Sequence, residues 1–333
     1  MLLNHADLLA HFNHTSTFRH ASDLPLTLLH LDSVAKLTSE THLVPLAEKN
    51  ALMATEGLAP VAYVQTNCDN PMKRDDLVEA MMQAGLKVDA MGPCLKNKDL
   101  PEGLSDPGRH KSEDFLRFLA RYKFVIAVEN AVCEDYVTEK VWRALEVGVV
   151  PIYFGAPNVR EYLPNDKSAV FPSDFKSVAE LVEFIKDLNV NDEKYREYLS
   201  HKPSYSKGRL VENENLLSAM KARPYRAEPG GMNFVEAFEC LVCERVSQNL
   251  KVSRMGFKPV PYRVNKDHYG CPEPKSALET LYGQDTKDDA YAYEYKKSGM
   301  EARLLSELIS KNEPFEPEYY ASEQWNIMKS LAK

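Results

Sequence analysis

The sequence lacks several features that would place it in a specialised class of protein. Its 333 residues contain no window of about 18 apolar residues, so no membrane-spanning helix is expected. The N-terminus has no basic start followed by an uninterrupted apolar core, which is the form of a signal peptide. Acidic residues outnumber basic ones by 49 to 41, and the net charge of −8 argues against a general nucleic-acid-binding protein. There is no internal repeat and no low-complexity segment.

Cysteine is scarce, and its six copies form no recognisable metal site. Cys240 and Cys243 make one C-x-x-C pair, but no second pair completes a four-ligand zinc site. Six cysteines can pair in many ways, and the sequence alone does not choose among them. Asn13 begins the glycosylation sequon Asn13-His14-Thr15. The cysteines and the sequon favour a secretory compartment, whereas the missing signal peptide taken alone favours the cytosol.

What is present is an ordinary globular composition, with 44% hydrophobic and 27% charged residues, and a length that suggests about two domains. Between residues 58 and 200, apolar runs of strand length alternate with amphipathic runs of helix length. The expected strands are 58–66, 87–92, 124–128, 149–155 and 168–171, and the expected helices are 74–84, 112–119, 138–147, 158–162, 177–188 and 192–199. This alternation is typical of a doubly wound α/β domain. Ligands bind such sheets at the carboxyl ends of the strands, so we expect the site just after Val64, Val128 and Phe154.

The flanking segments are less regular. Residues 1–57 show little periodicity, and residues 203–232 are rich in Pro, Lys, Arg and Gly, as in a connecting segment. A helix is expected over 234–252, carrying the C-x-x-C pair. The charged, tyrosine-rich tail has helix-like stretches near 300–311 and 321–331.

The segment 124–142 is the most informative part of the chain. A buried strand ends at Glu129 and Asn130, and a helix begins with Thr138 as its expected N-cap. A helix N-terminus at the carboxyl edge of a parallel sheet is an anion site. Lys140 in the first turn opposes the helix dipole by about 0.3–1 kcal/mol, a cost that an adjacent phosphate would turn into a gain. The alternative is that Lys140 is solvated or pairs with Glu139 or Glu134.

Arg74 occupies a similar place, near the start of the helix that follows the strand ending at Val64. Taken alone, it is more simply explained as a surface arginine paired with Asp75 or Asp76. If Arg74 and Lys140 lie at equivalent edges of one sheet, the pair favours a diphosphate ligand.

Residues 124–164, FVIAVENAVCEDYVTEKVWRALEVGVVPIYFGAPNVREYLP, resemble the α1,3-fucosyltransferases of glycosyltransferase family 10, whose donor signature has the form F-E-N-x₄-DY-x-TEK-x-W/Y. The segments FNHTSTFRHASDLPL, AYVQTNCDNPMKRDDLVEAM and VDAMGPCLKNKDLP resemble further blocks of this family. FECLVCERV and HYGCPEP resemble its animal branch numbered 10 and 11 and assigned to protein O-fucosylation. The resemblance covers nearly the whole chain.

The resemblance implies an α/β fold of the two-lobed GT-B type. Residues 58–202 would form a complete Rossmann-like lobe that binds GDP-fucose, residues 1–57 a remnant of the N-terminal acceptor lobe, and residues 203–333 the connecting segment, the C-x-x-C helix and a helical tail. The implied reaction transfers L-fucose with inversion from GDP-fucose to a glycan or to Ser/Thr of a secretory protein. It implies no cofactor, no metal and no nucleic-acid partner.

The resemblance also assigns roles to individual residues. Arg74 and Lys140 match the basic pair that binds the pyrophosphate and stabilises the leaving group, and Glu139 matches the carboxylate that binds donor hydroxyls. The other matches to the donor pocket are Asn130, Tyr136, Val64 and Thr66.

The catalytic base has no match in this chain. In the family it is a Glu in an E-S-P segment upstream of the F-N-x-T block, and that block begins here at Phe12. We therefore expect a chain that lacks the base and the first half of the acceptor lobe. Its full-length form is expected to be a type II membrane protein of the Golgi or endoplasmic reticulum. The alternatives are a donor-binding chain without activity, or a fragment that does not fold alone.

The resemblance changes the interpretation of the cysteines. In the family the C-x-x-C cysteines are tied by disulfides to the N-terminal lobe, so some or all of their partners would be missing here. Cys68 and Cys94 are a plausible pair, because the intervening helix can bring two strand ends together. Cys133 is expected to be a free, buried thiol.

Overall fold

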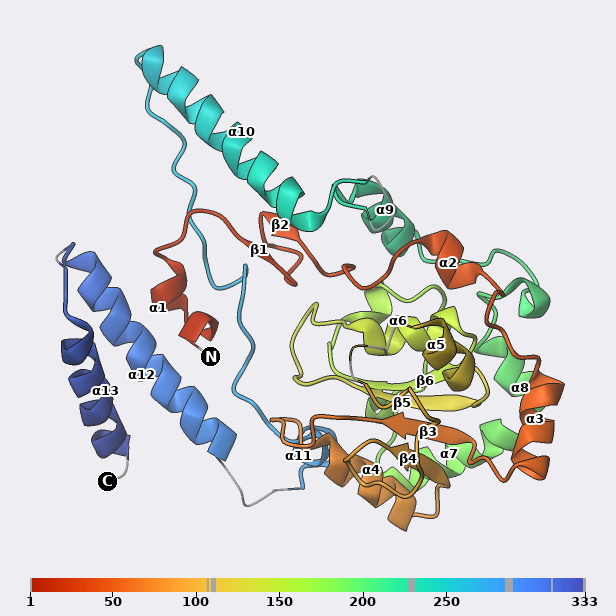
Figure 1. Cartoon of the computed structure of the whole chain (residues 1–333). Helices are drawn as coiled ribbons and strands as arrows, with labels where there is room; N and C mark the ends of the chain where they lie inside the picture. The colour runs from red at the N-terminus through yellow and green to blue at the C-terminus, as the bar shows by residue number, and fades with distance from the viewer. Residues whose placement is uncertain are drawn as a thin grey trace.

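The computed structural model describes residues 2–106, 108, 112–226, 231–284, 290–312 and 314–331. At its centre lies a four-stranded sheet of order β4-β3-β5-β6, in which every pairing is parallel (Figure 1). Its strands are β3 (Val61–Val64), β4 (Val88–Met91), β5 (Phe124–Val128) and β6 (Val150–Phe154). The expected strand at 168–171 contributes only an isolated bridge between Val170 and Ile152.

Helices cover both faces of this sheet. Helices α4 (Arg74–Gln83) and α7 (Val178–Val190) lie on one face, and α5 (Glu113–Leu119) and α6 (Glu139–Glu146) lie on the other (Figure 1). All residues of β5 are buried, with Phe124, Ile126 and Val128 in one hydrophobic cluster and the alternate residues in clusters on the opposite face. The α/β architecture with a parallel sheet agrees with the prediction, and the two-lobed GT-B assignment and the three-part domain division remain predictions.

The N-terminal segment is divided, because residues 2–9 contact the C-terminal helix over 290–310 and later residues pack onto the sheet unit. The segment forms η1 (Leu2–Asn4), α1 (Ala6–Leu9), α2 (Val34–Thr38), α3 (Leu46–Thr55) and a two-stranded parallel pair of β1 (Ser16–Thr17) and β2 (Leu24–Pro25). Leu28, Leu31 and Leu37 join the hydrophobic cluster around Trp142 of α6. The N-terminal segment therefore buries part of its apolar surface against the helix that follows β5.

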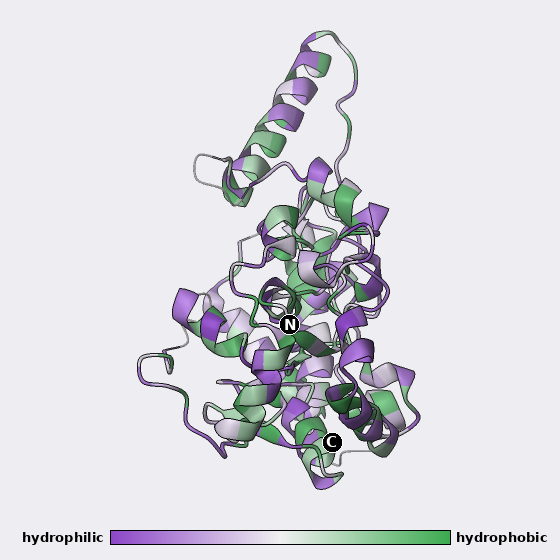
Figure 2. Ribbon diagram, turned by 90° about the vertical axis from the view of Figure 1, so that its right-hand side faces the viewer, coloured by the Kyte–Doolittle hydropathy of each residue, from purple (hydrophilic) through white to green (hydrophobic). Residues whose placement is uncertain are grey.

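The remaining elements after β6 are mostly helical. They are η3 (Val159–Glu161), η4 (Pro172–Asp174), α8 (Asp192–Glu197), η5 (Pro203–Tyr205), α9 (Glu214–Ala222), α10 (Phe234–Arg254), α11 (Ala277–Tyr282), α12 (Ala290–Ser310) and α13 (Pro317–Leu331). Helix α12 contacts α1 and α13. Helix α10 projects away from the sheet unit and mixes hydrophilic and hydrophobic residues along its length (Figures 1 and 2). Among the described residues, none of the helices has the length and apolar character needed to cross a bilayer.

Two disulfides join distant parts of the chain. One links Cys68 to Cys94, the pair that the sequence made plausible. The other links Cys133 to Cys271, so the expectation of a free Cys133 thiol is wrong. The reason is that the segment after α10 returns to the loop that follows β5, a long-range contact that no local pattern reveals. Cys240 and Cys243 are unpaired and exposed on α10.

Candidate active site

A cavity of about 290 Å³ opens at the carboxyl edge of the sheet. Its walls come from the segment after β3, Asn130 two residues after the end of β5, the first turns of α4 and α6, and the loop over 100–106. Six of the predicted donor residues line it, namely Val64, Thr66, Arg74, Asn130, Glu139 and Lys140. Tyr136 instead lines a neighbouring, mostly apolar cavity of about 690 Å³. The sheet therefore brings Arg74 and Lys140 to one cavity from two different strand–helix junctions.

Arg74 is almost completely buried, with 1% of its surface exposed. Its Nη1 donates to Asn130 Oδ1 at 2.6 Å, and its Nη2 donates to the carbonyl oxygen of Asn67 at 2.6 Å. This burial shows that the alternative of a surface arginine paired with Asp75 or Asp76 is wrong, and Asp75 instead accepts a hydrogen bond from the hydroxyl of Tyr63. Within the described part of the chain, the buried Nε of Arg74 has no hydrogen-bond acceptor. A buried guanidinium with a free donor beside a cavity suits an anionic ligand.

Lys140 pairs with a carboxylate that the sequence prediction had not proposed for it. Its Nζ lies 3.1 Å from Glu129 Oε2 and 3.1 Å from Thr138 Oγ1, and its side chain is 11% exposed. Glu129 is fully buried at the end of β5. Burial raises the pKa of Glu129, and the charge of Lys140 and the hydrogen bonds from Thr138 oppose that rise. The alternative that Lys140 is solvated or pairs with Glu139 or Glu134 is therefore wrong, because its partner is the buried Glu129.

Thr138 is the N-cap residue of α6, but its side chain does not cap the helix. Its hydroxyl donates to Glu129 Oε2 at 2.7 Å, and its backbone N–H donates to Glu129 Oε1 at 2.8 Å. The carboxylate of Glu129 therefore accepts the backbone N–H at the start of the helix, whereas the sequence predicted capping by the Thr138 side chain. A signal for this role was available, since Glu129 is the first polar residue after five apolar ones.

Glu139 and Arg143 complete the charged lining from α6. Burial raises the pKa of Glu139, but Lys140, its own backbone N–H and Arg143 outweigh burial and leave that pKa lowered. Arg143 lies with its guanidinium 5.1 Å from the centre of the Phe115 ring. The sequence prediction missed Arg143, although it stands four residues after Glu139 and hence on the same helix face.

The loop between β5 and α6 is fixed by Asp135. Asp135 is fully buried with a positive φ of 65°, and it accepts hydrogen bonds from His20, Asn158 and Tyr162. The next residue, Tyr136, packs edge-on against Phe18 with ring centroids 5.3 Å apart. Burial raises the pKa of Tyr136 to about 12, so its hydroxyl is neutral at physiological pH. These contacts tie the loop to the segment around residue 20.

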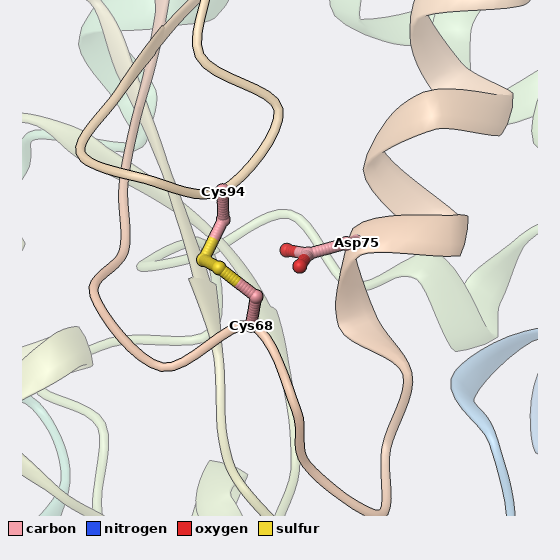
Figure 3. A group of neighbouring side chains, drawn as sticks. All are labelled: Cys68, Asp75 and Cys94. Atoms are coloured by element: carbon pink, nitrogen blue, oxygen red, sulfur yellow. A yellow bond between two sulfur atoms is a disulfide. The ribbon is translucent and has the colours of Figure 1, made fainter.

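One cluster of possible metal ligands occurs in the described residues, but its two cysteines are not free to bind a metal. Cys68, Cys94 and Asp75 have ligand atoms within 4.8 Å of one another. Figure 3 shows the carboxylate of Asp75 pointing toward the two bonded sulfur atoms. The two sulfur atoms are joined in a disulfide, and a metal needs thiolates. The sequon residue Asn13 is exposed, with its amide donating to the carbonyl of Tyr262 at 2.9 Å.

Comparison with known proteins gives clear relatives. A family model described as glycosyltransferase family 10 (fucosyltransferase) C-term matches residues 56–255. A GDP-fucose protein O-fucosyltransferase 3 from Danio rerio is 41% identical over 314 residues, which cover 94% of this chain and 67% of the relative. The protein of the same name from Homo sapiens is 38% identical over 331 residues, covering 98% of this chain and 67% of the relative. The chain thus spans about two thirds of the length of these relatives.

These relatives are named protein O-fucosyltransferase 3, and not by the numbers 10 and 11 that the sequence resemblance suggested. Among solved structures, an alpha1,3-fucosyltransferase with GDP-fucose aligns with 72% of this chain and 70% of its own chain. Its sequence identity is 19% and its TM-score is 0.42.

Proposed function

Because the chain belongs to glycosyltransferase family 10, the fucosyltransferases, we propose that it transfers L-fucose from GDP-fucose to a hydroxyl group of a protein. The observation that carries this proposal is the meeting of Arg74, Lys140 and the N-terminus of α6 at one cavity. As the sugar departs, negative charge develops on the β-phosphate of GDP. Two positioned cations and the helix N-terminus stabilise this charge as it forms.

The remaining lining residues suit the rest of the donor. Glu139, whose lowered pKa keeps it ionised, accepts hydrogen bonds from donor hydroxyls, as on the ribose. Asn130 holds the Arg74 guanidinium, and Val64 and Thr66 line the cavity next to β3. Tyr136 lines the larger apolar cavity, on which side we place the approach of the acceptor. Fucose becomes oxocarbenium-like as the bond to GDP breaks, and the acceptor hydroxyl attacks the opposite face, which inverts the configuration.

We place the protein in an oxidising compartment of the secretory pathway. Two disulfides support this, because disulfides persist in the endoplasmic reticulum and beyond but are rare in the cytosol. The protein acceptor follows from the names of the relatives, which are protein O-fucosyltransferases. The reaction as proposed uses no metal and no cofactor.

The alternative is a chain that binds the donor without turning it over. The observation that favours it concerns the carboxylates beside the cavity, because the acceptor hydroxyl needs a base. Glu129 is fully buried and paired with Lys140, and Glu139 serves the donor in our proposal. Asp106, another carboxylate in the lining, accepts a hydrogen bond from the backbone N–H of Gly108 at 2.8 Å. Transfer of fucose by the purified chain at a rate above that of uncatalysed hydrolysis would reject this alternative.

The proposed function is tested by titrating GDP into the chain and into its Arg74→Ala and Lys140→Ala variants. Each substitution removes a charge-assisted contact to the pyrophosphate, so we expect the dissociation constant to rise about tenfold or more. Lys167→Ala is the control, because Lys167 is exposed and pairs with Glu197 far from the cavity. Unchanged GDP affinity in both active-site variants would refute the proposal.

A further inference from the structure

Glu129 is a charged group next to the proposed donor site that has no contact with the cavity. It is fully buried, and it is absent from the lining, whereas its partner Lys140 lines the cavity. We propose that Glu129 is the counter-ion of Lys140. Glu129 holds the Lys140 ammonium in place while the donor site is empty, and its charge lowers the affinity of the site for GDP, so that GDP leaves after transfer. This inference rests on the proposed function, and it concerns a residue to which that function gives no role.

The surroundings of Glu129 are built around its carboxylate. Three donors converge on the two oxygens, namely the N–H and hydroxyl of Thr138 and the ammonium of Lys140. The backbone N–H of Glu129 donates to the carbonyl of Phe154 at 2.8 Å. A Cβ on Gly155 would lie 2.5 Å from Cγ of Glu129 and 2.9 Å from the hydroxyl of Tyr153. Glycine at 155 therefore leaves the space that the Glu129 side chain occupies.

The pair is asymmetric in exposure. Glu129 is sealed from water, whereas Lys140 reaches the cavity and has a third N–H besides the two that bond Glu129 and Thr138. A phosphate oxygen bound at that N–H, at about 2.8 Å, would lie about 5 Å from the bonded Glu129 oxygen, because the N–H groups of an ammonium are arranged tetrahedrally. Lys140 can therefore bind the pyrophosphate without leaving Glu129.

Two effects on GDP affinity oppose each other, and their sizes decide the outcome. Repulsion between the carboxylate and one phosphate charge about 5 Å away, at the effective dielectric near a protein surface, weakens binding by up to about a few hundredfold. Anchoring of Lys140 by Glu129 strengthens binding, because an ordered side chain loses less entropy. Thr138 still holds the ammonium when Glu129 is neutral, so the anchoring effect is the smaller one. The net result is that Glu129 lowers the affinity for GDP, which makes the release of GDP after transfer faster.

The experiment measures the affinity of GDP and of guanosine, which lacks the pyrophosphate, for the chain and for Glu129→Gln. The amide keeps the size of the side chain and an acceptor for the N–H of Thr138. We expect Glu129→Gln to bind GDP about tenfold more tightly and guanosine unchanged. The matched control is Glu146→Gln, a buried carboxylate on α6 that pairs with Lys36 away from the cavity, and it should change neither affinity.

A second background separates the repulsion from the anchoring. In a Lys140→Met chain there is no ammonium to anchor, so the further change Glu129→Gln removes only the repulsion and should again tighten GDP binding about tenfold or more. If Glu129→Gln is too unstable for titration, Glu129→Met removes the same charge with an apolar side chain of similar length, and the same tightening is expected. GDP binding that is unchanged or weaker in the folded neutral variant would overturn the inference. Failure of the unsubstituted chain to bind GDP would instead refute the proposed function.

Discussion

At the scale of single residues, the Glu129–Lys140 pair contributes to stability as well as to the site. Removing one partner of a buried pair leaves a charge with no compensation, which is strongly destabilising. In Lys140→Met that stranded charge is Glu129, which is fully buried. We expect the free energy of unfolding at pH 7 to fall by about 3 kcal/mol, measured by urea denaturation. Lys167→Met breaks an exposed pair with Glu197, and a loss as large in this variant would contradict the argument.

His201 predicts a dependence of stability on pH. It is completely buried, and its Nε2 lies 3.0 Å from the carbonyl oxygen of Leu145. Burial, followed by the charge of Lys202, lowers its pKa to about 3 in the folded chain, against 6.5 for a free histidine. Between these two values the unfolded state binds the extra proton and the folded state does not. The stability contributed by neutral His201 is therefore fully present above pH 6.5 and is lost as the pH falls toward 3.

The measurement compares urea denaturation of the chain and of His201→Gln at several pH values from 7 to 4. Below pH 6 the unsubstituted chain should lose about 1.4 kcal/mol more per pH unit than the variant, because glutamine does not titrate. If the free energy of unfolding changes with pH in the same way in both proteins, the protonation of His201 does not cause the pH dependence.

At the scale of elements, α6 is held at both ends. Its N-terminus faces the donor cavity, and its last carbonyls are bonded by buried cations. The ammonium of Lys49 donates to the carbonyl of Gly148, just after the helix, and that of Lys202 donates to the carbonyl of Glu146. Cations at a helix C-terminus are favoured by the helix dipole. This fixes the helix that presents Glu139 and Lys140 to the cavity.

Lys202→Met tests this anchoring. The ammonium of Lys202 also donates to the carbonyls of Leu37 and Ser39, so the substitution leaves three carbonyl oxygens without their donor. At about 1 kcal/mol each, we expect a loss of about 3 kcal/mol in the free energy of unfolding. The control Lys186→Met removes an ammonium that reaches the end of α4 from an exposed position, and it should cost less than about 1 kcal/mol. Equal losses in the two variants would show that burial of the Lys202 contacts is unimportant.

The elements also show what the sequence can predict. The strands and helices of the sheet unit follow from apolar runs and helical periodicity, and the structure confirms β3 to β6 and α4 to α7. Helices α9 and α11 were missed because they are short and embedded in segments rich in proline and charge. The grouping of Arg74 with Lys140 was predictable from strand ends. The Glu129–Lys140 pair was not, because it depends on how the loop between β5 and α6 folds back on β5.

At the scale of the whole molecule, the long-range contacts are the part that no local pattern predicts. The segment around residue 20 reaches Asp135, and the segment around residue 270 reaches Cys133. Both fix the loop that carries Tyr136, which lines the larger cavity. The geometry of the proposed site therefore depends on parts of the chain far outside the parallel sheet.

The two disulfides should stabilise the molecule to different extents. Cys133–Cys271 closes a sequence separation of 138 residues and Cys68–Cys94 one of 26. In the chain-entropy model the longer loop contributes about 5 kcal/mol and the shorter about 3.5 kcal/mol, since closing a longer loop removes more entropy from the unfolded chain. Urea denaturation of Cys133→Ala/Cys271→Ala and of Cys68→Ala/Cys94→Ala should therefore show the larger loss in the first. The reverse order would mean that the Cys133–Cys271 bond joins segments already held together in the unfolded chain, and that the contacts of Asp135 suffice to fix the loop beside Tyr136.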